Sequence, residues 1–244
     1  NKDLFPAILK QSKFGYDGKG QHQVNSISEV KAVLNGSNEN EFILEKKLNL
    51  DKEISVVLTR SSGGLSEIFP VIENQHEAGI LDLSIIPARV SENFKKEAVS
   101  YALKIAKNLN YVGTIAVEFF ISDGQLYVNE IAPRPHNSGH FTLDACNVSQ
   151  FDLQVLSLVD KSLIEINLEK NAVMLNLLGD LWLKNGEPET PNFEEIEGPG
   201  INIHLYGKNQ PRSGRKMGHI TVVGEKLENL INKVEEIRLK LLEM

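Results

Sequence analysis

Residues 113–140, GTIAVEFFISDGQLYVNEIAPRPHNSGH, contain two strand-like runs joined by a short turn. β-Branched and aromatic residues fill both runs, and the Asp123-Gly124 pair between them is typical of a β-hairpin. One acidic residue interrupts each run, Glu118 in the first and Glu130 in the second. The stretch therefore predicts an antiparallel hairpin that carries two carboxylates.

The register of this hairpin decides whether the two carboxylates meet. A two-residue turn would place Glu118 and Glu130 on opposite faces, because side chains alternate along a strand. A three-residue loop, Ser122–Gly124, would place Glu118 opposite Val128, with Glu130 as its diagonal neighbour on the same face. We predict the three-residue loop, since an isolated carboxylate in an apolar strand is costly.

Two neighbouring carboxylates repel each other unless a cation lies between them. Oxygen ligands without Cys or His in the two strands favour Mg²⁺, with Mn²⁺ as a second possibility. We therefore expect Glu118 and Glu130 to bind a divalent metal ion. The alternative is that each glutamate pairs with a buried Lys or Arg in a structural ion pair.

The loop that follows, RPHNSGH (134–140), concentrates groups that bind anions. Arg134 and His136 flank a proline, and Asn137, Ser138 and His140 come next. A guanidinium and two imidazoles on a backbone fixed by proline suit an anion site. The alternative is a capping loop before the next helix, with its histidines in solvent.

Toward the N-terminus, AILKQSKFGYDGKGQHQV (7–24) places three glycines between strand-like runs. The spacing fits neither GxxxxGK[ST] nor a GxGxxG loop that opens a helix. A strand, glycine loop and strand remain, a flap whose bare amides can fold over phosphates while Lys10 supplies a positive charge. A mobile turn with incidental glycines is the alternative.

Toward the C-terminus, YGKNQPRSGRKMGH (206–219) is a basic segment. It contains Lys208, Arg212, Arg215, Lys216 and His219 in a chain whose net charge is −7. Such a segment either is a solvated turn or binds a phosphate group.

Strand-like runs outnumber helices, which favours an α+β fold with largely antiparallel sheets. Helices are expected at 28–35, 91–109, 149–160 and from Glu225 onward, and strands at 5–10, 41–48, 53–60, 67–72, 114–120, 125–131, 172–178, 201–206 and 219–224. The segment 184–200, rich in Pro, Gly and Glu, is expected to lie on the surface.

Composition limits the class of protein. The 244 residues can bury a real core, and the net charge of −7 argues against a broad nucleic-acid surface. No segment has the length and apolarity to cross a membrane. The single cysteine, Cys146, cannot form an internal disulfide, which favours the cytoplasm. No signal peptide is visible and the first residue is not Met, so we expect a piece of a longer protein.

Taken in order, the strand ending in Lys10, GYDGKGQ, EKKLNLDKEISVVLTR, the hairpin with its loop, and YGK…PRSGRKMGH resemble the ATP-grasp ligases over essentially the whole chain. GYDGKGQ and NEIAPRPHNSGH resemble more narrowly the members that carboxylate 5-aminoimidazole ribonucleotide. The resemblance implies two α+β subdomains that clasp ATP, a small one at 1–79 with the flap and an adenine hinge and a large one at 80–168 with the metal hairpin. A β-rich C-terminal region at 169–244, ending in a helix, would complete the substrate site.

The resemblance also implies a role for each site residue. ATP would contact Lys10, Gly15, Tyr16, Asp17, Gly18, Lys19, Gly20, Gln21, Glu45, Lys46, Lys47, Leu48, Glu53, His76, Asn129 and Glu130, and Mg²⁺ would bind Glu118 and Glu130. Bicarbonate and the ribonucleotide would contact Tyr16, Lys19, Arg134, His136, Asn137, Ser138, Lys208 and Arg215, with Arg134, His136 and Asn137 as the catalytic groups.

The implied activity is ATP- and bicarbonate-dependent carboxylation of 5-aminoimidazole ribonucleotide through carboxyphosphate, in purine biosynthesis. Another ATP-grasp ligase, of the formate-using glycinamide ribonucleotide transformylase or biotin carboxylase type, is the alternative. A nucleotide-binding module without turnover is a third possibility. Relatives form dimers, so a homodimer is expected, with no nucleic acid or membrane as partner. Members of the group begin with an N-terminal α/β domain that this chain lacks, so the chain alone is expected to be inactive.

Overall fold

The structure, a computed structural model, describes residues 4–12, 20–36, 41–184 and 187–243. Within these ranges the strands form two main sheets and one two-stranded ribbon, and every named strand pairing is antiparallel. The predicted α+β class with largely antiparallel sheets is confirmed. No helix of the described residues is both long and apolar enough to cross a membrane.

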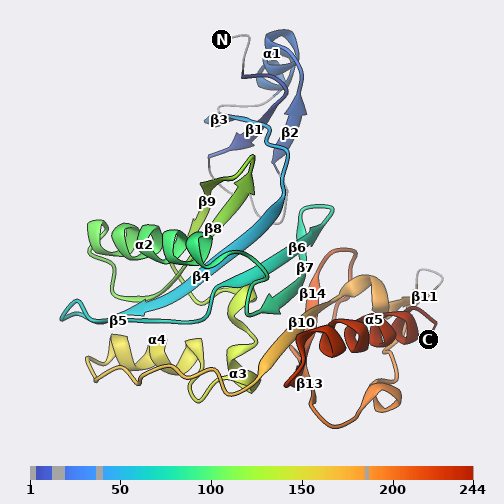
Figure 1. The fold of residues 1–244 in the computed structure, drawn as a ribbon. Helices are drawn as coiled ribbons and strands as arrows, with labels where there is room; N and C mark the ends of the chain where they lie inside the picture. The colour runs from blue at the N-terminus through green and yellow to red at the C-terminus, as the bar shows by residue number, and fades with distance from the viewer. Residues whose placement is uncertain (1–3, 13–19, 37–40, 185–186, 244) are drawn as a thin grey trace.

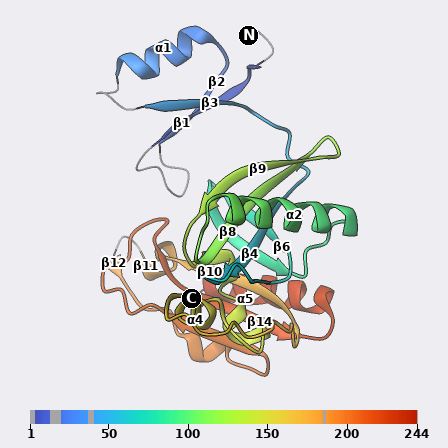
Figure 2. The ribbon, with the colours of Figure 1, turned by 90° about the vertical axis from the view of Figure 1, so that its left-hand side faces the viewer.

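The N-terminal sheet has three strands in the order β2-β1-β3 (Figure 1). Its elements are β1 (Ala7–Gln11), β2 (Gln21–Val24), α1 (Ile27–Asn35) and β3 (Phe42–Lys46). Ser26 caps α1, because its side chain accepts a hydrogen bond from the Glu29 amide. Val30 of the helix then packs on Leu9 and Val24 in a small core. Figure 2 shows this unit set apart from the rest of the molecule, with the segment between β3 and β4 leading to the larger sheet.

The larger sheet has nine strands in the order β13-β14-β10-β7-β6-β4-β8-β9, with β5 beside β4 (Figure 1). Its strands are β4 (Lys52–Arg60), β5 (Ser66–Ile68), β6 (Ile72–Glu77), β7 (Ile80–Ile86), β8 (Gly113–Ser122), β9 (Gln125–Ala132), β10 (Asn171–Leu178), β13 (Ile201–Leu205) and β14 (Lys216–Gly224). The ribbon pairs β11 (Leu183–Lys184) with β12 (Glu187–Pro188).

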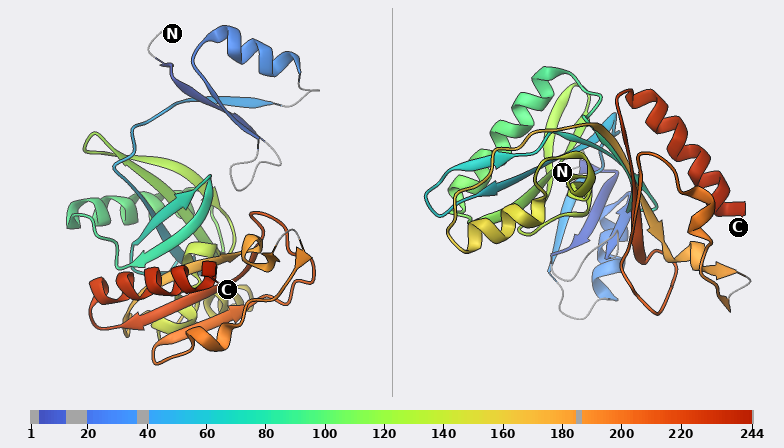
Figure 3. Two further views of the ribbon diagram at one scale, coloured as in Figure 1. Left: turned by 90° about the vertical axis from the view of Figure 1, so that its right-hand side faces the viewer. Right: turned by 90° about the horizontal axis from the view of Figure 1, so that it is seen from below.

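Helices cover both faces of the larger sheet. The helical segments are α2 (Glu92–Asn108), α3 (Thr142–Ala145), α4 (Gln150–Leu158) and α5 (Leu227–Glu243), with 3₁₀ turns η2 (Asn137–Gly139), η3 (Gly179–Trp182) and η4 (Phe193–Ile196). Figure 1 shows α2 and α4 on opposite sides of β4. Ile54, Val56 and Leu58 pack in the core under α2, whereas Val57 packs in the core under α4. Burial on both faces explains why β4 is apolar at consecutive positions. α5 covers β10 and β14 (Figure 3).

The hairpin of β8 and β9 differs from the predicted register. The turn has two residues, because Ser122 pairs with Gln125, and Asp123 and Gly124 both have positive φ, 50° and 69°. The predicted three-residue loop is therefore wrong. An irregularity follows, at which Phe119 pairs with Val128 but Glu118 pairs with Glu130. This β-bulge adds one residue to β9, so the two glutamates still share a face.

The predicted strand at 67–72 is interrupted. β5 ends at Ile68 and β6 begins at Ile72, and both pair with β4 on the same edge. Pro70 lies between them and has no backbone N–H to donate, so the pairing breaks there. The hairpin of β6 and β7 was not predicted: β6 is mostly polar after Ile72, and β7, ILDLSII (80–86), was overlooked although its sequence is rich in Ile and Leu.

Strand pairing groups the chain into two main sheets, whose limits can be compared with the expected subdomains at 1–79, 80–168 and 169–244. The small sheet ends at Lys46, and β4 to β6, which precede residue 79, belong to the larger sheet. β10 and β14 continue the same sheet past residue 168, through pairing of β10 with β7. The change from one sheet to the other therefore lies between β3 and β4, and the expected subdomain limits stay a prediction.

Glu73 of β6 is a buried charge that links β6 to two cations. Its carboxylate accepts hydrogen bonds from Lys52 Nζ at 2.7 Å and from Arg89 N, Nε and Nη2 at 3.0, 3.0 and 2.6 Å. Burial raises the pKa of Glu73, but the bonds from Arg89 and Lys52 outweigh burial and hold this pKa below its ordinary value.

Glu73→Gln is expected to lower the free energy of unfolding by about 1–3 kcal/mol at neutral pH, because charged hydrogen bonds are lost. The folded-state pKa is lowered, so this stabilisation is present above the unfolded carboxyl pKa and is lost as the pH falls through the folded-state value. Urea unfolding of wild type and Glu73→Gln at neutral pH and below about pH 4 measures the loss of unfolding free energy and its dependence on pH. Glu92→Gln, which removes the exposed partner of Lys95, is the control and should change little. A difference between wild type and Glu73→Gln that stays constant with pH would contradict the ionic account.

Candidate active site

Glu118 and Glu130 face each other across β8 and β9 on one side of the sheet. Burial raises the pKa of Glu118, and Glu130 and Glu53 raise it further, while His76 and Lys216 oppose them. A divalent cation between the carboxylates would offset both the burial and the repulsion. The oxygen donors at this position therefore fit a hard cation such as Mg²⁺.

Glu53 and His76 lie beside this pair on β4 and β6. His76 Nδ1 is 3.0 Å from Glu53 Oε2. Burial lowers the pKa of His76, but the carboxylates of Glu53 and Glu118 raise it, and the net pKa is above the ordinary value. The structure thus brings together two residues that the sequence pointed to only through the resemblance.

Lys10 connects the small sheet to the hairpin. Its Nζ lies 2.5 Å from Glu45 Oε2 and donates a hydrogen bond to Asn129 Oδ1 at 3.1 Å. Glu45 is on β3, and Asn129 is the residue beside Glu130 at the β-bulge. A cation on one sheet therefore reaches the edge of the carboxylate pair on the other.

The other expected ATP contacts are placed only in part. Gly15, Tyr16, Asp17, Gly18 and Lys19 lie outside the described residues. Gln21 opens β2 and Gly20 precedes it, with φ 77°, packed against Gln11, where a Cβ would lie 2.7 Å from Gln11 Oε1. Lys46 ends β3 and is exposed, and exposed Lys47 and half-buried Leu48 follow in the segment between the two sheets.

The RPHNSGH loop is held in place by Gln150, a fully buried residue at the start of α4. Gln150 Oε1 accepts a hydrogen bond from His136 N at 2.8 Å, and Gln150 Nε2 donates to His136 O at 2.8 Å. His140 Nδ1 lies 3.1 Å from the same Nε2. Sequence reasoning missed Gln150, because its role arises from a contact across 14 positions.

His136 is directed at the carboxylate pair. Its Nε2 lies 3.3 Å from Glu118 Oε1. Burial, followed by the charges of Arg134 and Lys216, lowers the pKa of His136 to about 3. The ring is therefore neutral at physiological pH. Arg134 is exposed, and its Nη1 donates to Pro135 O at 3.0 Å.

Asn137 is paired with Asn176 of β10. Asn137 Nδ2 donates to Asn176 Oδ1 at 3.0 Å, and Asn176 Nδ2 donates to Asn137 Oδ1 at 2.7 Å and to Leu81 O at 2.7 Å. This reciprocal amide pair fixes the orientation of Asn137. Asn176 was also missed, because an Asn in an apolar strand gives no signal of its partner.

Ser138 is enclosed behind His136. It is fully buried, and its Oγ lies 2.9 Å from Ser55 Oγ and 3.0 Å from His136 Nδ1. Its hydroxyl is therefore engaged by protein groups on both sides. The expected contact of Ser138 with the substrate stays a prediction.

The C-terminal basic segment contributes charge unevenly. Arg215 Nη1 donates to Gln210 O at 2.6 Å, and Lys208 Nζ lies 5.0 Å from the centre of the Tyr206 ring and donates to Lys216 O. The charge of Lys216 lowers the pKa of both Glu118 and His136. This lysine is therefore the cation of the segment whose charge is felt at the carboxylate pair. The resemblance had singled out Lys208 and Arg215 and not Lys216.

His219 is buried and is not a surface cation. Its ring is stacked on His204 at 4.5 Å with 12° between the planes, and Asp144 Oδ2 lies 3.0 Å from His204 Nε2. Nitrogen lone pairs lie in the ring planes, so those of two parallel rings do not converge on one ion. Asp144, His204 and His219 lie close together but their geometry does not suit metal binding.

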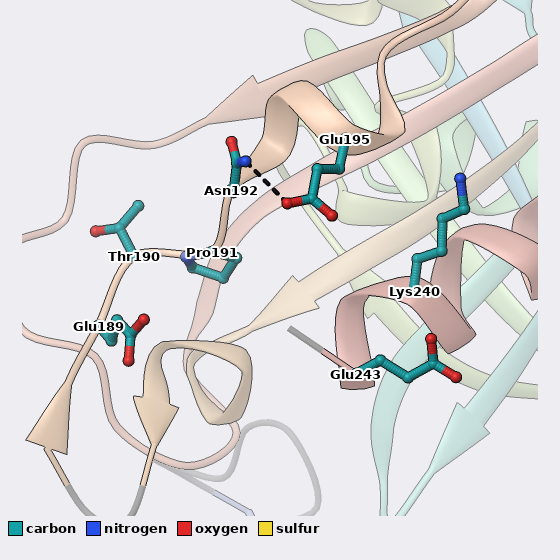
Figure 4. Close-up of a pocket in the computed structure, with 7 residues that line it drawn as sticks. All are labelled: Glu189, Thr190, Pro191, Asn192, Glu195, Lys240 and Glu243. Carbon is teal, nitrogen blue, oxygen red and sulfur yellow. Dashed lines mark hydrogen bonds between the residues drawn. The ribbon is translucent and has the colours of Figure 1, made fainter.

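A hollow of about 570 Å³ lies elsewhere, between the segment after β12 and the end of α5 (Figure 4). It is lined by Glu189, Thr190, Pro191, Asn192, Glu195, Lys240 and Glu243. Asn192 Nδ2 donates to Glu195 Oε1 at 3.0 Å within it. It contains none of the expected site residues.

Comparison with known families defines the class of protein. Residues 3–151 match the ATP-grasp domain, and residues 172–233 match the phosphoribosylaminoimidazole carboxylase C-terminal domain. The chain belongs to the ATP-grasp family.

Two similar proteins carry the same name. N5-carboxyaminoimidazole ribonucleotide synthase of Staphylococcus aureus (strain COL) is 43% identical over 235 residues, which cover 95% of this chain and 59% of that protein. The Bacillus subtilis (strain 168) protein of the same name is 40% identical over 231 residues, 94% of this chain and 59% of the relative. The chain therefore spans about three fifths of the relatives that it matches.

Solved structures agree with the fold. The S. aureus N5-carboxyaminoimidazole synthetase complexed with ADP has a TM-score of 0.84 at 40% identity, covering 97% of this chain and 61% of that one. The Aspergillus clavatus N5-carboxyaminoimidazole synthase in complex with ADP and 5-aminoimidazole ribonucleotide has a TM-score of 0.85 at 27% identity, covering 98% and 64%. The resemblance stated from the motifs is confirmed.

Proposed function

We propose that the protein containing this chain carboxylates 5-aminoimidazole ribonucleotide, using ATP and bicarbonate and releasing ADP and phosphate, in purine biosynthesis. The observation that carries the proposal is the convergence of Glu118, Glu130, Lys10 and His136 from two sheets and one loop. The names of the relatives and the ligands of the A. clavatus complex support the same reaction.

Bicarbonate needs activation because hydroxide is a poor leaving group. Transfer of the γ-phosphoryl group from ATP to a bicarbonate oxygen gives ADP and carboxyphosphate. The exocyclic amine of the ribonucleotide then attacks the carboxyl carbon, or CO₂ released from it, and loses a proton as phosphate departs. Such transfers depend on positioning and charge neutralisation, not on covalent help from the protein.

The residues of the small sheet and hairpin suit the nucleotide. Lys10, held between Glu45 and Asn129, supplies a fixed positive charge at the edge of the carboxylate pair. Glu53, held by His76, offers a carboxylate for the ribose hydroxyls. Glu118 and Glu130 would hold Mg²⁺, which neutralises phosphate charge when bound.

The loop and the basic segment suit the other substrates. Arg134 is exposed and presents a guanidinium to bicarbonate and to anionic phosphate oxygens. Asn137, fixed by Asn176, offers an oriented amide. Lys208 and Arg215 are assigned to the 5′-phosphate of the ribonucleotide, and His136, neutral at physiological pH, orients Glu118.

The proposal extends to a cytoplasmic homodimer. The single cysteine, Cys146, cannot form an internal disulfide, which fits a reducing compartment, and burial raises the pKa of its thiol to about 12. The homodimer rests on the relatives' group alone, and sedimentation of the full-length protein tests it.

An acceptor assay with the full-length protein tests the activity. ADP formation from ATP should require both bicarbonate and 5-aminoimidazole ribonucleotide, and ¹³C-bicarbonate should label the product. ADP formation that requires glycinamide ribonucleotide with formate, or biotin with bicarbonate, would favour the alternative ligases. Nucleotide binding without ADP formation under any of these conditions would overturn the proposal in favour of a regulatory module.

A further inference from the structure

A chain of buried polar side chains runs from β7 to the RPHNSGH loop. Ser84 Oγ donates to Asn74 Oδ1 at 3.0 Å, and Asn74 Nδ2 donates to Ser55 Oγ at 2.9 Å. Ser55 Oγ donates to Ser138 Oγ at 2.9 Å, and Ser138 Oγ lies 3.0 Å from His136 Nδ1. Both amide atoms of Asn74 are engaged and the three serines are fully buried, so these hydroxyls find their partners inside the protein.

The chain has one direction of donation. An amide nitrogen can only donate, so Ser55 Oγ accepts from Asn74, and Ser55 Oγ donates in turn to Ser138 Oγ. Ser138 Oγ accepts that hydrogen bond, and its own proton is available to His136 Nδ1, 3.0 Å away. The Ser138 backbone N–H, 3.4 Å from the same Nδ1, independently marks this nitrogen as an acceptor. The ring proton of His136 therefore resides on Nε2.

We infer that Ser55, Asn74 and Ser84 are positioning residues that fix the tautomer of His136 and so turn an N–H toward Glu118. Nε2 is 3.3 Å from Glu118 Oε1, so the N–H attracts the carboxylate. With the proton on Nδ1, a lone pair would face that oxygen and repel it. The inference rests on the proposed function, because Glu118 is the carboxylate assigned to the metal, and partners behind such ligands commonly matter for metal binding and activity.

We call the hydrogen-bonded chain from Ser84 through Asn74, Ser55 and Ser138 to His136 the relay. Ser55→Ala in the full-length protein tests it, because Ser55 does not touch His136 directly. Long-range ¹H–¹⁵N spectra of ¹⁵N-histidine protein report the tautomer, and His136→Gln assigns the resonance. Wild type should show protonated Nε2, and Ser55→Ala should show a mixture of the two tautomers. The magnesium concentration for half-maximal ADP formation should rise about tenfold. Ser138→Ala, which removes the hydroxyl next to the ring, should shift the tautomer at least as far.

Ser157→Ala is the matched control. It also removes a buried serine hydroxyl with one hydrogen bond, to Gln154 O on α4, and should leave the tautomer and the magnesium dependence unchanged. An identical His136 tautomer in wild type and Ser55→Ala would overturn the relay, even if turnover is normal. A tautomer shift in a protein that forms no ADP with bicarbonate and the ribonucleotide would support the relay and reject the proposed function.

Discussion

Glu130→Gln in the full-length protein is expected to lower the rate of ADP formation by on the order of 10³-fold. Glu130 is one of two carboxylates that face each other across the hairpin, and an amide oxygen carries no charge to hold a divalent cation. The loss should persist at saturating ATP and bicarbonate. Initial rates at increasing Mg²⁺ concentrations measure it.

The same variant should not destabilise the metal-free protein. Glu130 is one cause of the raised pKa of Glu118, so its replacement by a neutral side chain relieves repulsion in the folded state. Thermal unfolding without Mg²⁺ should therefore give an equal or higher midpoint than wild type. Asp123→Asn, which removes one charge from the turn of the same hairpin and tolerates the positive φ, is the control and should retain activity. Bicarbonate-dependent ADP release by Glu130→Gln at the wild-type rate would refute the metal assignment.

Lys10→Met is expected to reduce kcat/KM for ATP by on the order of 10²-fold. The substitution keeps the aliphatic stem but removes the charge that lies between Glu45 and Asn129. The substrate phosphates would lose one fixed cation, and the small sheet would lose its hydrogen bond to the hairpin. Steady-state rates at varied ATP, together with calorimetric binding of ADP, separate a loss of affinity from a loss of turnover.

Lys31→Met supplies the comparison for Lys10→Met. Lys31 is an exposed cation on α1 of the same subdomain, and its loss changes the net charge equally. It should leave kcat/KM for ATP unchanged. Equal effects of the two substitutions would indicate a general electrostatic contribution and would remove Lys10 from the nucleotide site.

The hairpin illustrates how far sequence reasoning reaches. Burial cost correctly indicated that Glu118 and Glu130 share a face, but it gave the wrong register. A two-residue turn alone would put the two glutamates on opposite faces of the hairpin. A bulge in β9 brings them back to the same face, and the sequence did not indicate this combination. Most strands were predicted where β-branched residues cluster, but β6 has few such residues, and β7 was overlooked although it contains three Ile residues.

The residues behind the site could not be predicted. Gln150, Asn176 and Ser55 act through contacts with residues 14, 39 and 83 positions away, and a single sequence contains no signal for such distances. Ser138 was assigned to the substrate through the resemblance alone, and the sequence did not indicate that its hydroxyl is buried against Ser55 and His136. Motifs identified side chains with suitable chemistry, and packing decided which of them are accessible.

The bulge in β9 separates the hairpin tip from the carboxylate pair. The pairing that follows from the turn runs from Ser122 to Phe119, and the bulge then shifts the register so that Glu118 pairs with Glu130. Residues added at the tip would lengthen an exposed connection and leave the alignment intact. The tip is therefore a suitable point for inserting a peptide tag or attaching a fluorophore on this ribbon.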